Sequence, residues 1–288
     1  MQRTALRATL AVLIGPSLLL LTALNVAPFF LGVYMSLYYW SLANLGPPRF
    51  LGLLNYEYLF ADYRFIDSIK VSLLFVVLSV ATELVLGTTL AFVFSSRARG
   101  MASLRRISLL PVMVMPLVAG LVWFYLFNPT YGTVTWLCYA VGLGRIPFLT
   151  KDWLALLCLV IADVWQWTPL VMVVVFAALQ SIPEYCYEAG KMDGLSQRQM
   201  LWRITLPLIR PAIVVIMILR AIDSFRNIEL VYMMTRGGSG TETLPWYIYS
   251  TAFIDGNLGS AAAMAVVMVL FVTVLTQFLV GRLRYRQA

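Results

Sequence analysis

The sequence lacks residue types on which most enzymes and small secreted domains depend. It has no histidine, and its three cysteines, Cys138, Cys158 and Cys186, lie far apart in the chain. These residues provide no histidine base, no zinc-binding spacing and no disulfide framework. No nucleophile paired with a base can be identified either, so an enzyme is a poor hypothesis. We expect neither a catalytic residue nor a metal site in this chain.

Charge is also scarce, because only 12% of the residues are charged whereas 61% are hydrophobic. The mean hydropathy of +0.85 is too high for a soluble domain of this length. The apolar runs are continuous and about 20 residues long, which favours helical spans over the short alternating strands of a membrane β-barrel. The chain is therefore predicted to be an all-α integral membrane protein.

Six apolar runs are long enough to cross about 30 Å of hydrocarbon. They cover residues 10–37, 71–94, 108–127, 154–179, 212–234 and 261–280. The first run begins like a signal peptide but continues without a convincing cleavage site, so we expect it to remain as a span. Residues 1–288 then form a single transmembrane domain, with a polar loop at residues 181–211 between spans four and five.

The net charge of +8 is explained by membrane topology, not by nucleic acid, because the basic residues stand singly at the ends of apolar runs. With both termini inside, thirteen Lys and Arg residues face the cytoplasm and six face outward. The inner set is Arg3, Arg7, Arg97, Arg99, Arg105, Arg106, Lys191, Arg198, Arg203, Arg210, Arg282, Arg284 and Arg286, and the outer set is Arg49, Arg64, Lys70, Arg145, Lys151 and Arg236. The positive-inside rule therefore predicts an N-in, C-in orientation.

The polar loop at residues 181–211 carries the signals of two short helices. Ser181 with Glu184, and Ser196 with Gln199, both have the spacing of a capping box. Asp193-Gly194 between them suits a turn, because glycine adopts a positive φ without a Cβ clash. With both termini inside, this loop faces the cytoplasm.

The order of residues in this loop resembles a known family motif. Glu188-Ala189-Gly190, Asp193-Gly194 and Ile204-Thr205-Leu206-Pro207 resemble the EAA loop of permease subunits of binding-protein-dependent ABC importers. Gly190 stands where a second alanine is usual, and Leu195 stands where a small residue commonly follows Asp-Gly. The resemblance implies that the loop docks on an ATPase through the following residues: Tyr185, Glu188, Ala189, Gly190, Met192, Asp193, Gly194, Leu206 and Pro207. The alternative is an ordinary amphipathic loop.

Two further stretches resemble the carbohydrate-uptake branch of these permeases, the MetI-like or maltose-type family. They are Phe50–Tyr56, read FLGLLNY, and the segment from Ser224 to Tyr249. The resemblance implies the type I ABC importer permease fold in a bacterial cytoplasmic membrane. It also implies an ABC ATPase dimer that binds ATP and Mg²⁺, a second permease subunit that we expect to be a different chain, and an extracytoplasmic substrate-binding protein. No cofactor is expected on this chain itself.

Several ionisable or polar residues lie inside predicted spans, where such residues are expensive and usually functional. Glu83 in span two is best interpreted as a carboxyl group that is protonated or hydrogen-bonded to a neighbouring helix, and the alternative is a role in substrate binding. Span five contains four charged residues that alternate in sign at intervals of three: Arg220, Asp223, Arg226 and Glu229. Each can pair with the next along the helix. This face must line a cavity or a helix interface, and the alternative is an ion-pair ladder that only sets helix packing. The predicted substrate pathway comprises Asp163, Gln166, Trp167, Arg220, Asp223, Arg226, Asn227 and Glu229.

The glycine-rich stretch Arg236–Thr241 is not a phosphate-binding loop, because it lacks the Gly-Lys-Ser/Thr ending and lies on the outer side. As flexible outer backbone it could contact a binding protein. ATP hydrolysis must therefore come from another subunit.

For the substrate, paired charges and aromatic residues favour a neutral sugar, oligosaccharide or polyol. An anionic glycerol phosphate is the alternative within the class, and it would use Arg220 or Arg226. A secondary transporter driven by protons through Glu83, Asp163 or Asp223 is the alternative from another class. The sequence does not identify the individual sugar.

Overall fold

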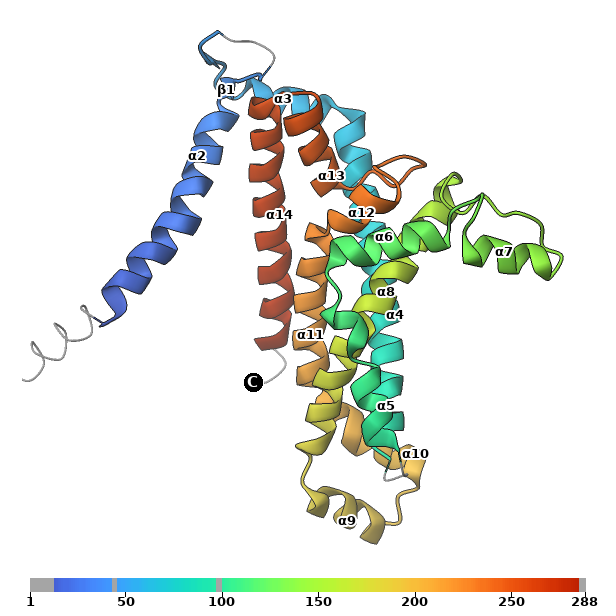
Figure 1. Ribbon diagram of the computed structural model, residues 1–288. Coiled ribbons are helices and arrows are strands. Elements are labelled where there is room, and N and C mark those ends of the chain that lie inside the picture. The colour runs from blue at the N-terminus through green and yellow to red at the C-terminus, as the bar shows by residue number, and fades with distance from the viewer. Residues whose placement is uncertain (1–12, 43–45, 97–99, 285–288) are drawn as a thin grey trace, which may run out of the picture. The chain divides into compact units, whose positions relative to one another are not determined.

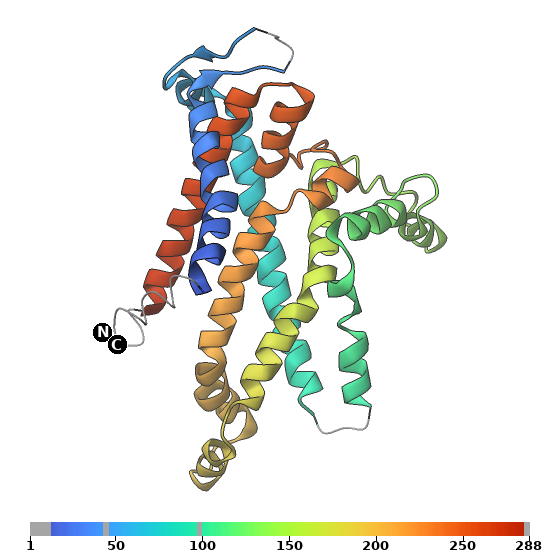
Figure 2. The same cartoon turned by 60° about the vertical axis from the view of Figure 1, so that its left-hand side comes forward.

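The computed structural model describes residues 13–42, 46–96 and 100–284, and this part of the chain is mainly helical (Figures 1 and 2). Residues 10–12 of the first predicted span, and Arg3, Arg7, Arg97, Arg99 and Arg286, lie outside the described residues. The chain folds as two compact units. One comprises Met1–Ile66 and Ile248–Val274, and the other comprises Asp67–Tyr247 and Leu275–Ala288.

The helices and strands follow one another with short connections. The α-helices are α2 (Ala27–Ser36), α3 (Leu54–Ala61), α4 (Tyr63–Phe94), α5 (Met101–Ile107), α6 (Pro116–Leu126), α7 (Thr133–Ala140), α8 (Asp152–Gln180), α9 (Glu184–Met192), α10 (Gln197–Met200), α11 (Leu206–Arg226), α12 (Glu229–Met234), α13 (Leu244–Tyr249) and α14 (Leu258–Arg284). The π-helical turns are η1 (Thr22–Val26), η3 (Leu201–Thr205) and η4 (Ser250–Ile254), and η2 (Leu110–Met113) is a 3-10 turn. Strands β1 (Tyr38–Tyr39) and β2 (Arg49–Phe50) form an antiparallel pair.

Among the described residues, five helical stretches are long and apolar enough to cross a membrane, and a sixth is formed if a bent pair counts as one span. They are Leu13–Ser36, Tyr63–Phe94, Asp152–Gln180, Gln197–Arg226 and Leu258–Phe278, and the bent pair is Met101–Met113 with Pro116–Leu126. The prediction of an all-α membrane protein is confirmed. Two predicted spans differ in detail from the helices observed.

Span three, predicted as one helix over residues 108–127, is broken. The two parts of the pair meet at 96°, and Val114 and Met115 between them have extended backbone. Pro116 begins α6, where its missing N–H costs nothing because the N–H groups of the first turn have no acceptor within the helix. Hydropathy alone predicted a straight span because the residues on both sides of the break are apolar.

Span five, predicted over residues 212–234, begins earlier and ends earlier than expected. The helix runs without interruption from Gln197 through η3 into α11 and stops at Arg226. Asn227 is extended, and α12 starts afresh at Glu229. The wide turn of η3 lies directly before Pro207, which has no N–H to donate, so the π-turn precedes a position where an α-helical hydrogen bond is impossible.

In the first unit, the FLGLLNY motif completes the end of the first long helix. Asn55 is buried, and its Nδ2 donates to the carbonyl oxygens of Ser36 at 2.7 Å and Tyr38 at 3.1 Å. The hydroxyl groups of Tyr56 and Ser36 are 2.7 Å apart. Gly52 has φ +62°, a conformation that favours glycine. The motif therefore satisfies the carbonyl group of Ser36 at the C-terminus of α2 and that of Tyr38 in β1.

Replacing Asn55 by alanine is expected to lower the free energy of unfolding by about 2 kcal/mol, because two buried carbonyl groups lose their donor. Thermal unfolding of the purified chain measures the change. Glu57→Ala, at an exposed position of the same helix α3, is the matched control. An Asn55→Ala protein as stable as the control would show that water replaces the amide.

In the second unit, α4, α8 and α11 run along one another (Figures 1 and 2). Helix α8 is the core helix, because its most apolar stretch is 67% buried, compared with 33% for α4 and 28% for Gln197–Arg226. Gly87 of α4 allows a close approach to α8, since a Cβ there would lie 2.7 Å from Val171. Helix α6 runs across α8 and packs on α12 (Figure 1). Helices α9 and α10 lie beyond the ends of α8 and α11 (Figures 1 and 2).

Candidate functional site

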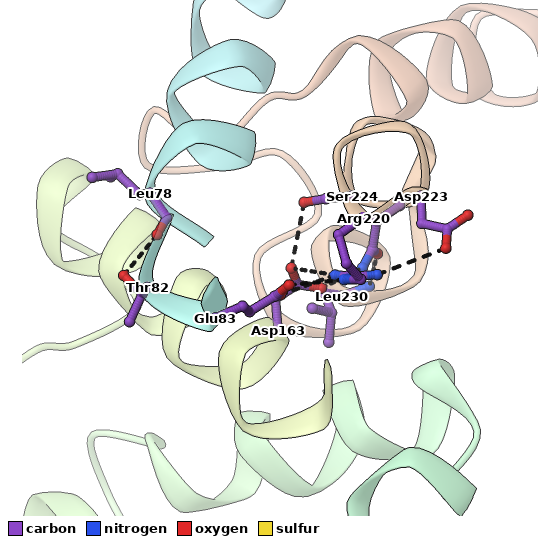
Figure 3. Close-up of polar contacts among 9 residues, drawn as sticks. Leu78, Thr82, Glu83, Asp163, Arg220, Asp223, Ser224 and Leu230 are labelled. Carbon is purple, nitrogen blue, oxygen red and sulfur yellow. Dashed lines mark hydrogen bonds and ion pairs between the residues drawn. The ribbon is translucent and has the colours of Figure 1, made fainter. Parts of the chain in front are cut away.

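A cluster of three buried charged residues joins α4, α8 and α11. We call Glu83, Asp163 and Arg220 the charge cluster, and their exposed fractions are 0%, 0% and 1%. Arg220 Nε donates to Glu83 Oε2 at 2.8 Å, and its Nη2 donates to Glu83 Oε1 at 3.0 Å. The same Nη2 donates to Asp163 Oδ2 at 3.2 Å. Figure 3 shows the guanidinium between the two carboxylates on one side and Asp223 on the other.

Asp163 has further donors on two sides. The hydroxyl of Ser224 donates to Oδ2 at 3.3 Å, and Nδ2 of Asn227 donates to Oδ1 at 3.2 Å (Figure 3 shows the serine). Asn227 Oδ1 in turn accepts from the backbone N–H of Leu230 at 3.2 Å, which satisfies a donor in the first turn of α12. Asn227 thus links the end of α11, the start of α12 and the charge cluster.

A pocket of about 280 Å³ lies beside the cluster and is lined by charged residues of α11 and α12. We call it the Arg220 pocket, and its lining is Pro116, Trp167, Arg220, Asp223, Arg226, Asn227 and Glu229. The guanidinium of Arg220 lies over the Trp167 ring, with Cζ 4.6 Å from the centroid. This cation–π contact fixes the aromatic face at the edge of the pocket. Six of the eight residues predicted for the substrate pathway line this pocket, and Asp163 lies directly behind it.

The alternative for span five, an ion-pair ladder along the helix, is not found among the described residues. Arg220 reaches Asp223 only at 3.9 Å, and Asp223 is 56% exposed. Within the described part of the chain, Arg226 makes no ion pair, and Glu229 accepts only from the backbone N–H of Ile228 at 3.1 Å. Arg220 turns toward α4 and α8 instead, because buried carboxylates there require a partner more strongly than solvated ones do.

Gln166, also predicted for the substrate pathway, lies at the break in span three. It is buried, and its Nε2 donates to the carbonyl oxygen of Val114 at 2.7 Å. That carbonyl belongs to the extended segment between η2 and α6, where no helical partner is available. Non-helical backbone at membrane depth needs such a donor from the protein. Gln166 therefore stabilises the break next to Pro116.

The sequence reasoning missed two contributors, Ser224 and Pro116. Nothing in the sequence distinguishes Ser224 beyond its place in a family pattern, or Pro116 beyond its place within a span. The assignment of Glu83 as a carboxyl hydrogen-bonded to a neighbouring helix agrees with its contact to Arg220. The separation of 137 residues between these two partners left no signal in the sequence.

The polar loop at residues 181–211, which we call the coupling loop after the role proposed for it below, contains the two predicted short helices. The capping box at Ser196 is confirmed, because Gln199 N donates to the Ser196 hydroxyl at 3.4 Å and Ser196 N donates to Gln199 Oε1 at 2.8 Å. The capping box at Ser181 is wrong. Its hydroxyl donates to the Ala178 carbonyl at 2.8 Å, and α9 begins after Pro183 without a side-chain cap.

Helix α9 ends in a Schellman motif that explains the Asp-Gly pair. The N–H of Leu195 donates to the Gly190 carbonyl at 2.9 Å, and the N–H of Gly194 donates to the Lys191 carbonyl at 3.0 Å. Gly194 has φ +73°, as the motif requires of the residue after the C-cap. Tyr185 and Met192 project from the same helix, with exposed fractions of 68% and 89%. A short helix with a fixed end thus presents large apolar side chains.

Gly190 packs against the following turn. A Cβ at this position would lie 2.7 Å from Cδ1 of Ile204 and 3.5 Å from Cδ1 of Leu195. The space that an alanine would occupy at position 190 is filled by Ile204. Gly190 and Leu195, the two departures from the usual motif, therefore lie next to each other in the same packed region.

Gly190→Ala is expected to cost up to about 1 kcal/mol through this overpacking, and the higher helix propensity of alanine offsets part of that loss. Shortening the partner in Gly190→Ala/Ile204→Val removes the clashing methyl group and should recover most of the loss. A double-mutant cycle of thermal unfolding measures the coupling between the two positions. Additive effects of the two substitutions would contradict the contact.

The glycine-rich segment after α12 is held by local hydrogen bonds. The Thr241 hydroxyl lies 2.6 Å from Gly238 O and 2.7 Å from Thr235 Oγ1, and Thr241 is buried. Gly237 packs on Trp246, where no Cβ could fit. The interpretation of this segment as freely flexible backbone receives no support from these contacts.

Comparison with known proteins places the chain in a family. Residues 83–286 match the family described as binding-protein-dependent transport system inner membrane component. The chain belongs to this family. The match covers the charge cluster, the Arg220 pocket and the coupling loop, so all three are parts of the permease.

Relatives with assigned transport roles are similar along most of the permease. The trehalose/maltose transport system permease protein MalF of Thermococcus litoralis is 33% identical over 82% of this chain and 81% of its own length. The sn-glycerol-3-phosphate transport system permease protein UgpA of Agrobacterium fabrum is 31% identical over 80% of this chain and 79% of its own. The permease is thus a transport subunit and a multi-pass inner-membrane protein.

The fold is also shared with a solved structure. A chain of a bacterial ABC transporter involved in the import of the acidic polysaccharide alginate superposes with a TM-score of 0.85 at 21% identity. The superposition covers 99% of the permease and 98% of that chain. The predicted permease fold is confirmed.

Proposed function

We propose that this permease translocates a neutral sugar, oligosaccharide or polyol through the Arg220 pocket, as one subunit of an ATP-driven importer. The observation that carries the proposal is the pocket itself, where the Trp167 ring and several charged side chains converge. Aromatic faces bind the apolar faces of sugar rings, and charged groups make strong hydrogen bonds to hydroxyl groups. Polar cavities between helices are typical positions for transported substrates.

The charges around the pocket favour a neutral substrate over an anionic one. The Arg220 guanidinium already binds Glu83 and Asp163. Of the remaining charged residues of the lining, Asp223 and Glu229 are acidic and Arg226 is basic. A phosphate or uronate group would meet two carboxylates and one uncommitted guanidinium, so its own charge would be poorly matched.

A glycerol phosphate is the second candidate, and two observations favour it. Arg226 lines the pocket and makes no ion pair with any described residue. A relative is named as a glycerol-3-phosphate permease. Competition for uptake of a labelled sugar separates the candidates. We expect an excess of the same unlabelled sugar to abolish this uptake and an excess of glycerol 3-phosphate to leave it unchanged. The reverse result would assign the pocket to the phosphate.

The coupling loop provides the contact with the ATPase subunits. The exposed side chains of Tyr185, Glu188 and Met192 on α9 offer apolar knobs and a charge to an ABC ATPase dimer. That dimer binds ATP and Mg²⁺, and this chain contributes no nucleotide site. An extracytoplasmic binding protein delivers the substrate, and a second permease subunit, different from this chain, completes the pathway. This arrangement requires the N-in, C-in orientation that the distribution of Lys and Arg predicts.

Transport then follows from two packings of the same helices, one open inward and one open outward. Their free energies need to differ by only a few kcal/mol, so that ATP binding and the binding protein can each favour one of them. Helix α9 contacts η3, and η3 belongs to one helical stretch, Gln197–Arg226, that ends at the Arg220 pocket. We expect movement of α9 to reach the pocket along this stretch.

A mild-detergent pull-down of the tagged chain from its native membrane tests this assembly. We expect an ATPase and a second six-span protein to co-purify, with ATP hydrolysis by the complex. A solitary chain that transports in vesicles, and whose uptake collapses with an uncoupler at constant ATP, would favour the secondary transporter and overturn the proposal.

A further inference from the structure

The charge cluster contains more acidic than basic groups. Two carboxyl groups, Glu83 and Asp163, surround a single guanidinium, Arg220, and the three side chains are almost inaccessible. If both carboxyl groups were ionised, the cluster would carry one uncompensated negative charge. Such a charge in a buried site is strongly unfavourable.

No other basic residue compensates this charge within the described part of the chain. The charged residues that face the cluster from the surrounding helices are Asp223 and Arg226 on α11 and Glu229 on α12, which all line the adjacent Arg220 pocket. Asp223 adds a third acidic group, at 3.9 Å from Arg220 Nη1. Arg226 is exposed and bonds to neither buried carboxyl group. The described side chains therefore do not supply the positive charge that would compensate the second carboxylate.

The two carboxyl groups lie close enough to act as one unit. Oε1 of Glu83 and Oδ2 of Asp163 bind the same nitrogen, Arg220 Nη2, at 3.0 Å and 3.2 Å. Two acidic groups so close together titrate as a pair and readily share one proton. The Arg220 pocket is lined by Arg220 but by neither carboxyl group. A proton, which needs no volume, therefore suits the site better than a metal ion does.

We propose that the Glu83–Asp163 pair holds one proton, which makes the charge cluster electrically neutral. The cluster then joins α4, α8 and α11 without a net charge at membrane depth. A neutral amide at either position reproduces the protonated acid, so each single replacement keeps the cluster neutral. Amides at both positions leave the buried guanidinium with only the exposed carboxylate of Asp223, 3.9 Å from Nη1, as a counter-ion.

Infrared spectroscopy of the purified full-length chain at neutral pH tests the shared proton. The wild-type protein should show the carbonyl stretch of a protonated carboxylic acid, shifted only slowly by D₂O. That band should be lost in Glu83→Gln and in Asp163→Asn, because each leaves a single ionised carboxylate. Glu57→Gln, at an exposed position, is the control that keeps the band. Absence of the band from wild type, or its persistence in both cluster variants, overturns the proposal.

Thermal unfolding provides a second, independent measurement. Each single amide variant should melt within a few degrees of wild type, whereas the double variant should melt lower by about 5 °C or more. A double variant as stable as the single ones overturns the proposal. If a single variant does not fold, the spectrum of wild type decides alone. Neither measurement depends on transport, so failure of the proposed sugar import leaves both results interpretable.

Discussion

Replacing Arg220 by methionine is expected to lower the free energy of unfolding by about 3 kcal/mol and to reduce uptake at least about 100-fold. Methionine fills a similar volume but leaves Glu83 and Asp163 without the donor they share. It also removes the cation that lies over Trp167. Thermal unfolding of the purified chain measures the first effect, and substrate uptake by reconstituted vesicles measures the second.

A rescue variant separates the structural from the transport role of Arg220. Adding Glu83→Gln and Asp163→Asn to Arg220→Met removes the unpaired charges, so most of the stability should return. Uptake should stay low, because the pocket still lacks its guanidinium. The control is Arg106→Met, at an exposed position of α5, outside the loop at residues 181–211. If the triple variant transports like wild type, the charge cluster only packs helices, and Arg220 does not belong to the substrate pathway.

Hydropathy was sufficient to predict the long helices but not their interruptions. The runs predicted at residues 71–94 and 154–179 fall inside α4 and α8, because about 20 apolar residues in succession have few alternatives to a membrane helix. The break at Val114 and Met115 depends on a donor from a distant helix, Gln166. Hydropathy contains no information about such a donor.

The charged residues were found by sequence reasoning, but their partners were not. A spacing of three along span five suggested pairs within one helix, since the sequence shows only local neighbours. Packing of α4, α8 and α11 places two buried carboxyl groups beside Arg220, and these bind it at shorter distances than Asp223 does. Partner choice follows burial, which a single sequence does not reveal.

The coupling loop was predicted well because its signals are local. A capping box and an Asp-Gly turn act over three or four residues, so Ser196 and Gly194 could be assigned without the fold. The capping box predicted at Ser181 is absent for a related reason. It lies at the end of α8, where its hydroxyl binds the last turn of that helix, and the helix that follows begins after Pro183.

Charge reversal at Glu188 is expected to weaken ATPase association about tenfold or more while leaving the fold of this chain intact. Glu188 is exposed on α9 and makes no hydrogen bond or ion pair with any described residue. Nothing within the described part of the chain therefore needs its charge. A reversed charge at a docking surface places like charges together, which costs several kcal/mol where the surface is complementary. Co-purification of the ATPase and ATP-dependent uptake in vesicles are the measurements.

Glu57→Lys is the matched control for Glu188→Lys, because it makes the same charge change at an exposed position of α3, outside the coupling loop. Both variants should unfold at the wild-type temperature, and only Glu188→Lys should lose the ATPase and uptake. Loss of both in the control would point to a general effect of charge on assembly. Normal uptake by Glu188→Lys, at normal expression, would show that α9 does not dock through this residue, and attention would move to the exposed apolar side chains of Tyr185 and Met192.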